Sequence, residues 1–258
     1  MRLRSGRVGV LTVRGVATAV AVAGLVMAIE VRADEELLTD RPDFTETSVV
    51  VAPRSFQLEG GLTFESAVDV ETLSGAELLL RAGLMKRLEL RLGAPDLVHT
   101  RVSGASDTGL GEAYVGLKLQ LGTSGAPNGL ALIPAVTFPT DPDASGGTAP
   151  ELVLTWAHDL PNEWAVGGIV GYAWLEQADR GPDVSFPTVS FARGFAERWG
   201  TFFEWAAEFP DGGDASHLAH HGYTYGLGAN GQLDVHLGIG LTDTAPDFFL
   251  GIGFALRR

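Results

Sequence analysis

Apolar and polar residues alternate strictly along several segments of this chain. Residues 56–65 read FQLEGGLTFE, so apolar side chains or glycine fill every even position and polar side chains or glycine every odd one. Because successive side chains of a β-strand point to opposite faces, this period-two pattern predicts strands with one apolar and one polar face. The same alternation recurs in residues 87–92, 112–120, 232–241 and 248–256.

The alternation and its interruptions predict twelve strands. They fall near residues 55–66, 74–83, 87–94, 109–121, 129–139, 150–158, 163–174, 184–194, 198–209, 221–229, 231–241 and 247–257. Most are about ten residues long, which is the length a tilted strand needs to cross a bilayer. Pro134 and Pro187 fall inside two of them. Each proline removes a ladder hydrogen bond, so these two strands are expected to be bulged, shifted or broken.

The connections between the predicted strands alternate in length. Short turns at residues 85–86, 159–162, 195–197 and 230 alternate with polar stretches at residues 94–108, 140–149, 175–183 and 210–220. Residues 122–128 are an exception, a longer turn on the short side. Outer-membrane barrels have short turns at one end and longer loops at the other, and aromatic girdles at both interfaces. The aromatic residues could also belong to the core of a soluble β-sandwich. The loop pattern instead favours an all-β, closed, up-and-down antiparallel transmembrane barrel.

The first 33 residues have the pattern of a secretory signal peptide. Four arginines precede an apolar run at residues 15–29, and Val31-Arg32-Ala33 offers small residues before a cleavage site. The run is shorter than the ~20 residues of a transmembrane helix, which disfavours a membrane anchor. We therefore expect a signal peptide at residues 1–33, a separate segment at residues 34–54 and a barrel at residues 55–258.

Charge and composition exclude several classes of protein. Loss of residues 1–33 removes five of the 18 basic and one of the 32 acidic residues, which leaves 13 and 31 and a formal charge of −18. Nucleic acid is therefore an unexpected partner. The absence of cysteine excludes disulfides and thiol chemistry. Beyond the signal peptide no apolar run approaches eighteen residues, yet mean hydropathy is +0.15, so apolar surface must face lipid rather than water.

The polar faces of the predicted strands would line the lumen of the barrel. They carry both signs of charge, so the charges either leave a wet selective path or pair across the lumen and fill it. The number of strands does not decide between these alternatives. The lumen candidates are Glu59, Glu65, Glu77, Arg81, Glu89, Arg91, Glu112, Lys118, Arg193, Glu204, Asp234 and His236.

The segment ahead of the barrel concentrates charge around Pro42 and Phe44. Its charged residues are Asp40, Arg41, Asp43 and Glu46. One hypothesis is that the segment folds into the lumen as a plug, with Arg41 pairing to a wall acid such as Glu59. The alternative is a loose periplasmic tail.

The sequence offers little for catalysis or for metal binding. His217, His220 and His221 have a spacing that could bind metal on a helix, but they lie in a predicted outer loop and are interpreted as ordinary loop residues. His99, His158 and Ser103 are the candidates for a lipid hydrolase, yet G-x-S-x-G and H-E-x-x-H motifs are absent. We expect no enzyme, no metal and no cofactor.

Two stretches carry a resemblance to a known family. Residues 38–64 (LTDRPDFTETSVVVAPRSFQLEGGLTF) and residues 230–257 (NGQLDVHLGIGLTDTAPDFFLGIGFALR) resemble the opening and closing segments of the outer-membrane family named for the MetA pathway of phenol degradation. Residues 79–93 and 109–121 are also similar to it. The resemblance implies insertion into outer-membrane lipid by the barrel-assembly machinery, and transport of small, often hydrophobic or aromatic solutes. Barrels of this kind usually end on an aromatic residue, whereas this chain ends in Arg257-Arg258.

Three functions are compatible with these observations. The leading one is a passive outer-membrane channel for a small solute. The alternatives are a structural barrel that conducts nothing and, less favoured, an outer-membrane lipid hydrolase.

Overall fold

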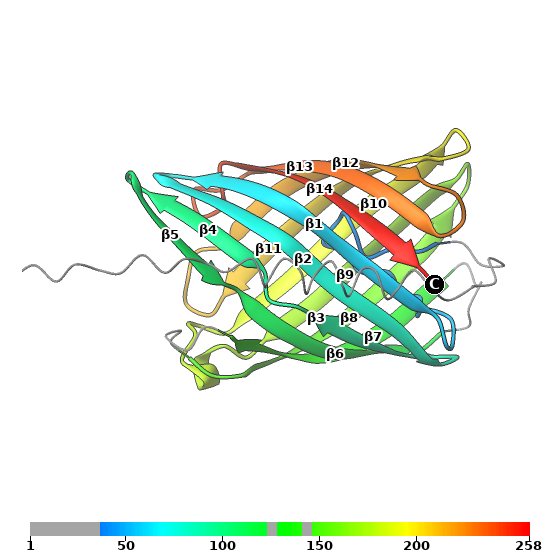
Figure 1. Cartoon of the computed structure of the whole chain (residues 1–258), viewed down its shortest axis with the longest axis horizontal. Coiled ribbons are helices and arrows are strands. Elements are labelled where there is room, and N and C mark those ends of the chain that lie inside the picture. The colour runs from blue at the N-terminus through cyan, green and yellow to red at the C-terminus, as the bar shows by residue number, and fades with distance from the viewer. Residues whose placement is uncertain (1–36, 123–127, 141–145) are drawn as a thin grey trace, which may run out of the picture. The chain divides into compact units, whose positions relative to one another are not determined.

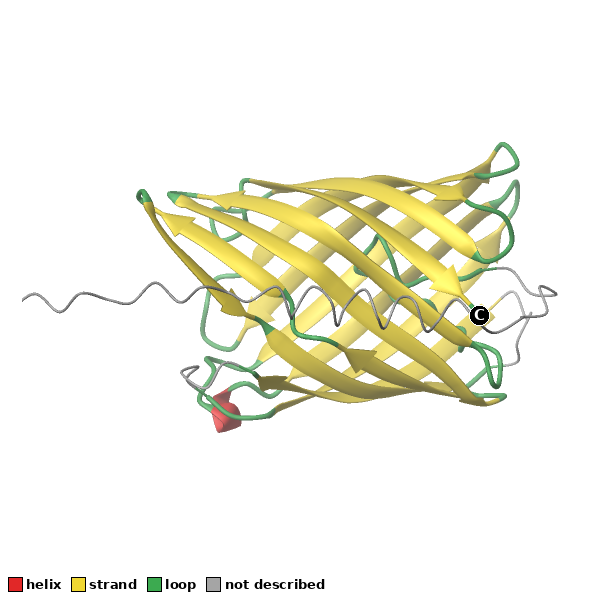
Figure 2. Cartoon of the chain, viewed as in Figure 1, coloured by secondary structure: helices red, strands yellow, loops and turns green. Residues whose placement is uncertain are grey.

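The computed structural model describes residues 37–122, 128–140 and 146–258, which form an antiparallel β-barrel (Figure 1). The predicted signal peptide and most of the predicted turn at residues 122–128 lie outside the described residues. The only helix in the described part is the single turn Glu176–Ala178, too short to cross a membrane (Figure 2). The strands are β1 (Phe56–Ala67), β2 (Val70–Met85), β3 (Leu88–Gly93), β4 (Leu97–Val102), β5 (Ala105–Leu110), β6 (Glu112–Gln120), β7 (Asn128–Pro139), β8 (Ala149–Leu160), β9 (Trp164–Ala173), β10 (Val184–Phe195), β11 (Trp199–Pro210), β12 (Ser216–Gly226), β13 (Gly231–Gly240) and β14 (Phe248–Arg257).

The sheet closes on itself because β1 pairs with both β14 and β2. The fourteen segments form twelve barrel strands, since β4 continues β3 and β5 continues β6. β3 pairs with β6 up to Gly93 and Tyr114, and β4 pairs with β5 from Leu97 and Leu110 onward in the same register. The β3–β4 strand is interrupted only at residues 94–96, and the β5–β6 strand only at residue 111. The prediction of a closed twelve-strand barrel is therefore confirmed.

Two predicted outer loops contain more strand than expected. The predicted loop at residues 94–108 is largely the β4–β5 hairpin, which pairs with the far end of β2, and the predicted loop at residues 210–220 contains the start of β12. The side chains of β4 and β5 are mostly exposed. A hairpin that buries no apolar face carries no apolar alternation, so the sequence pattern did not reveal it.

Both prolines lie in continuous strands. Pro134 is paired with Leu152 of β8, and only the β6–β7 pairing has a gap, at Ile133 and Pro134. Pro187 is paired with Val170 of β9, and only the β10–β11 pairing has a gap there. Each proline thus disturbs the ladder on one side without breaking its strand.

The outer face of the barrel is apolar and the inner face polar. Along β13, Leu233, Val235 and Leu237 are 43–50% exposed, whereas Asp234 and His236 are 6% exposed. Arg193 was predicted in the lumen, which is wrong. It lies directly across from Trp164 in the β9–β10 ladder, with its guanidinium 5.5 Å from the centre of that ring, on the face that carries the exposed Phe191. The tight turn between β10 and β11 places this pair at a barrel end, where a long cation can reach water.

Candidate functional site

Residues 38–52 form an irregular stretch, the lumen segment, that bonds to opposite walls of the barrel. The backbone N–H of Val51 donates to Glu89 of β3 at 2.7 Å. The backbone N–H groups of Phe44 and Thr45 donate to Glu204 of β11 at 2.9 and 2.8 Å. In the closed order of strands β3 and β11 face each other across the barrel, so the lumen segment crosses the lumen.

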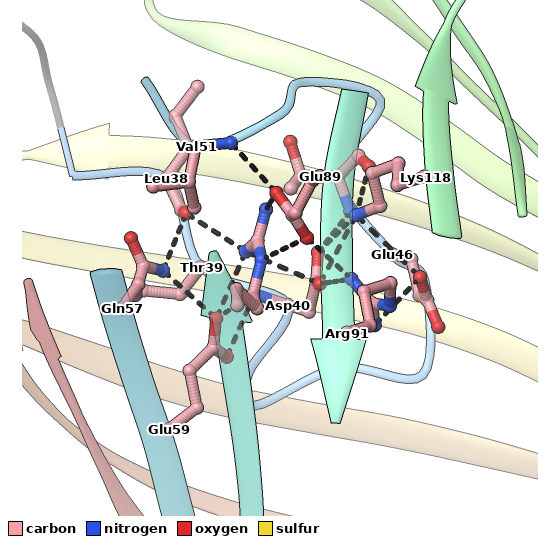
Figure 3. Close-up of polar contacts among 12 residues, drawn as sticks. Leu38, Thr39, Asp40, Glu46, Val51, Gln57, Glu59, Glu89, Arg91 and Lys118 are labelled. Atoms are coloured by element: carbon pink, nitrogen blue, oxygen red, sulfur yellow. Dashed lines mark hydrogen bonds and ion pairs between the residues drawn. The ribbon is translucent and has the colours of Figure 1, made fainter. Parts of the chain in front are cut away.

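Asp40 is the centre of an ion-pair network on one wall (Figure 3). Its carboxylate lies 2.6 Å from Arg91, 3.1 Å from Lys118 and 3.3 Å from Arg81. Burial disfavours the charged carboxylate, but the three cations outweigh burial and hold the pKa of Asp40 well below its usual range. The Asp40 carboxylate is therefore ionised whenever the lumen segment is bound in the lumen.

Three further carboxylates complete this network. Glu59 accepts hydrogen bonds from the backbone N–H groups of Asp40 and Arg41, both at 3.0 Å, and from Arg81 at 3.0 Å. Glu89 lies 2.8 Å from Arg81, and Glu46 lies 3.0 Å from Arg91. Three buried cations thus meet four carboxylates, two of which belong to the lumen segment. Paired in this way, charge can be held away from water without a large penalty.

Arg41 joins the lumen segment to a second part of the wall. Its guanidinium lies 2.9 Å from Glu77 of β2 and 3.3 Å from Asp234 of β13. A Cβ atom at Gly61 or Gly253 would overlap this guanidinium, so a larger residue at either position would displace Arg41 from where it lies. The predicted ion pair between Arg41 and Glu59 is wrong. The Glu59 carboxylate pairs with the Arg81 guanidinium, and Arg41 donates to it only through its backbone N–H.

Glu204 holds the middle of the lumen segment and begins a chain of buried polar side chains. Besides the two backbone N–H groups, it accepts from the Thr45 hydroxyl at 2.7 Å and contacts His220 Nδ1 at 2.9 Å. His220 Nε2 lies 2.9 Å from Nδ1 of His236. Burial and the nearby Glu204 raise the pKa of Asp43, so the carboxyl of Asp43 keeps its proton more readily than an exposed one.

The placement of the histidine group in an outer loop is wrong. His220 and its neighbours lie in β12, and His220 points into the lumen while His217 and His221 lie on the opposite face beside Trp205 and Phe203. Within the described residues, no group of histidines and carboxylates is arranged to hold a metal.

Most predicted lumen residues meet in this network, and a few do not. Glu112 lies at the outer end of β6, where its half-exposed carboxylate pairs with Arg180. Sequence reasoning missed His220, Gln57 and the two glycines that accommodate Arg41. Gln57 lies on the polar face of the first predicted strand and was detectable, whereas the glycines become meaningful only once Arg41 is placed against them.

A cavity of about 1060 Å³ lies inside the barrel, between the lumen segment and the wall formed by β8 to β13. Pro42, Asp43 and Thr45 border it on one side, and β8 to β13 border it on the other. Its mouth is formed by the turns at Glu163 and Glu197, which is the end of the barrel where β1 begins. The inward side chains of this wall are small, among them Ala157, Ala165, Gly167, Ser190, Ala192 and Gly200.

A closed twelve-strand barrel with an apolar outer face and a polar, partly filled lumen is an outer-membrane β-barrel. The chain belongs to the family described as the putative MetA-pathway of phenol degradation, whose model matches residues 39–257.

Solved structures agree with this fold. The outer membrane channel from Pseudomonas putida F1 is 15% identical with a TM-score of 0.55, covering 89% of this chain and all of that one. The NanC porin is 9% identical with a TM-score of 0.55, covering 78% of this chain and 98% of that one. The KdgM porin is 9% identical with a TM-score of 0.51, covering the same shares of the two chains. No curated protein matches the chain.

Proposed function

We propose that this protein is a passive outer-membrane channel for small solutes. The observation that carries the proposal is the division of the lumen into two parts. One part is filled by the ion pairs around Asp40, and the other is a cavity of about 1060 Å³. That volume lies at the upper end of the range for small-molecule sites, so a solute can be accommodated without removal of the ion-paired part.

The similar structures support the same function. They include an outer membrane channel and two porins. The family description points to phenol degradation, which fits a small aromatic or hydrophobic solute. Lumen charges and the outer loops would then set selectivity.

Reconstitution of the mature chain tests this proposal. Planar bilayers should show discrete conductance steps, and liposomes containing the protein should swell in a small uncharged solute faster than protein-free liposomes. Absence of both signals in correctly folded, heat-modifiable protein would contradict the channel and favour a non-conducting structural barrel. The alternative draws its support from the buried ion pairs, which fill part of the lumen.

The lipid-hydrolase alternative has weaker support. Nδ1 of His99 lies 2.7 Å from the Thr108 hydroxyl in the exposed β4–β5 hairpin, and Nδ1 of His158 contacts Asn128. A catalytic histidine needs a nucleophile and an orienting acid, and neither contact supplies that pair. Lipid turnover by purified protein that is lost in His99→Ala or His158→Ala would revive this alternative. The remaining proposed partners are outer-membrane lipid around the barrel and the assembly machinery during insertion.

A further inference from the structure

A group of aromatic rings surrounds Phe44, which lies between Asp43 and Thr45 of the cavity lining. The Phe44 ring centre lies 4.8 Å from that of His220 and 5.7 Å from that of Phe249. The ring centre of Phe202 lies 4.9 Å from that of His220, and Phe202 borders the cavity. These four rings, called the aromatic collar, join the lumen segment to β11, β12 and β14.

Position along the strands shows which way the collar faces. Phe202 lies near the start of β11, at the end of the barrel where the cavity has its mouth. Phe249 lies near the start of β14, which is the opposite, outer end. The collar therefore lies between the cavity and the outer half of the lumen.

Phe44 differs from the rest of the collar in exposure. It is 45% exposed, whereas Phe202 and Phe249 are each 4% exposed and His220 is 2% exposed. Its backbone is fixed by the hydrogen bond to Glu204, and it is the one member of the collar that is largely exposed. An aromatic ring in this position can turn about its side-chain torsions while the buried rings stay packed.

The charges of Arg41 and Glu46, which border the cavity from the lumen segment, are already paired. Arg41 is paired with Glu77 and Asp234, and Glu46 with Arg91. The small side chains of the cavity wall bring no charge of their own. Asp159, Glu163, Glu197 and Arg198 also line the cavity, toward its mouth. An ion that went on to the collar would lose its hydration without gaining a free partner, whereas an uncharged molecule loses little.

We propose that Phe44 is the specificity-determining constriction of the channel, and that small uncharged solutes with a flat ring pass it between the outer lumen and the cavity. The lumen segment stays seated on its ion pairs during this passage. A flat ring stacks on the collar as it passes, which favours ring-bearing solutes over others of similar polarity. This inference rests on the proposed channel function.

Liposome swelling with the full mature chain tests the constriction. The solutes are phenyl β-glucoside, glucose and gluconate, which compare a ring-bearing neutral solute, a plain neutral solute and an anion. Wild type should admit phenyl glucoside fastest and gluconate slowest. Phe44→Ala should speed both neutral solutes severalfold and reduce the preference for the ring, and Phe44→Trp should slow both.

The control is Val49→Ala, which shortens a side chain of the same segment but keeps the carbonyl that accepts from Arg81. It should behave as wild type. If wild type admits solutes and the Phe44 variants match it, the constriction is wrong while the channel stands. If neither wild type nor any variant admits solute, both proposals are wrong.

A second measurement separates passage beside a seated segment from loss of the segment. The reversal potential of Phe44→Ala in a salt gradient should equal that of wild type, because the Asp40 ion pairs remain. A shift toward anion selectivity would mean that the segment has left the lumen, which would overturn the proposal.

Discussion

The Asp40 carboxylate accepts a 2.6 Å hydrogen bond from the Arg91 guanidinium, although 51 residues separate the two along the chain. Arg91 points into the barrel from β3, together with Arg81 and Lys118 on neighbouring strands. The wall alone offers these three cations two carboxylates, those of Glu59 and Glu89. The lumen segment supplies the missing negative charge, so segment and wall form one electrostatic unit.

Deleting residues 38–47 should make the channel larger and more anion-selective. The deletion removes the negative charges of Asp40 and Glu46 and the positive charge of Arg41, so the lumen becomes less negative. Around the former position of Asp40, three wall cations then face two carboxylates. Single-channel conductance should rise and the reversal potential in a potassium chloride gradient should move toward that of chloride. The double variant Asp40→Asn with Glu46→Gln keeps the length of the segment and should reproduce the shift in selectivity. Unchanged conductance and selectivity in the deletion would argue against a segment that occupies the lumen.

Removal of one buried cation should destabilise the barrel. Arg91→Met leaves Asp40 and Glu46 short of a partner, and breaking a buried pair in this way costs about 3–5 kcal/mol of unfolding free energy. Arg101→Met is the matched control, because Arg101 and Glu71 form an ion pair whose side chains are 59% and 49% exposed. An exposed pair contributes less than about 1 kcal/mol. Both variants should be unfolded with urea from lipid vesicles. Equal losses of unfolding free energy in Arg91→Met and Arg101→Met would contradict the importance of burial.

Arg41 should need the space beside Gly253 in order to reach Glu77 and Asp234. A methyl group there would meet the Arg41 guanidinium, and overpacking of this kind costs about 1–3 kcal/mol. Gly122→Ala is the control, because its nearest neighbour would lie at an ordinary 3.5 Å. Gly253→Ala should lower the unfolding free energy and make the lumen segment more susceptible to chymotrypsin at Phe44. If Phe44 is cleaved no faster in Gly253→Ala than in the control, the segment does not depend on this contact.

Asp43 should make the barrel less stable as pH rises. Its pKa is raised in the folded protein, so the folded state holds the proton more tightly than the unfolded chain, and stability is lost as pH rises from 3.8 through the raised value. Asp43→Asn is neutral at every pH. It should therefore raise the melting temperature near neutral pH and have little effect below pH 3.8.

Asp40 provides the opposite control for this experiment. Its lowered pKa stabilises the folded state above 3.8, and that stabilisation disappears as pH falls below the ordinary value. Asp40→Asn should therefore lower the melting temperature near neutral pH. If both variants shift it in the same direction at neutral pH, the assignment of the two carboxyls is wrong.

The sequence predicted the barrel because alternation is a local property. Glu59 and Asp234 could be placed on the inner face from their immediate neighbours alone. Arg193 was assigned to the wrong face because few strictly apolar residues surround it. Its charge alone then placed it on the polar, lumen-facing side. The partners of Arg41 could not be predicted, since they depend on how β2, β13 and the segment are placed in space. His220 was missed because polar residues dominate the first half of β12 and resemble a loop.

The two partners of Arg41 come from the second strand and the second-last strand of the barrel. Arg41 leaves the ribosome ahead of the described strands, yet one of its two ion-pair partners is residue 234. A chain that stopped short of β13 could build several neighbouring strands and still lack the acid that holds this arginine. Engagement of Arg41 with both acids is thus a natural reporter that assembly has reached β13.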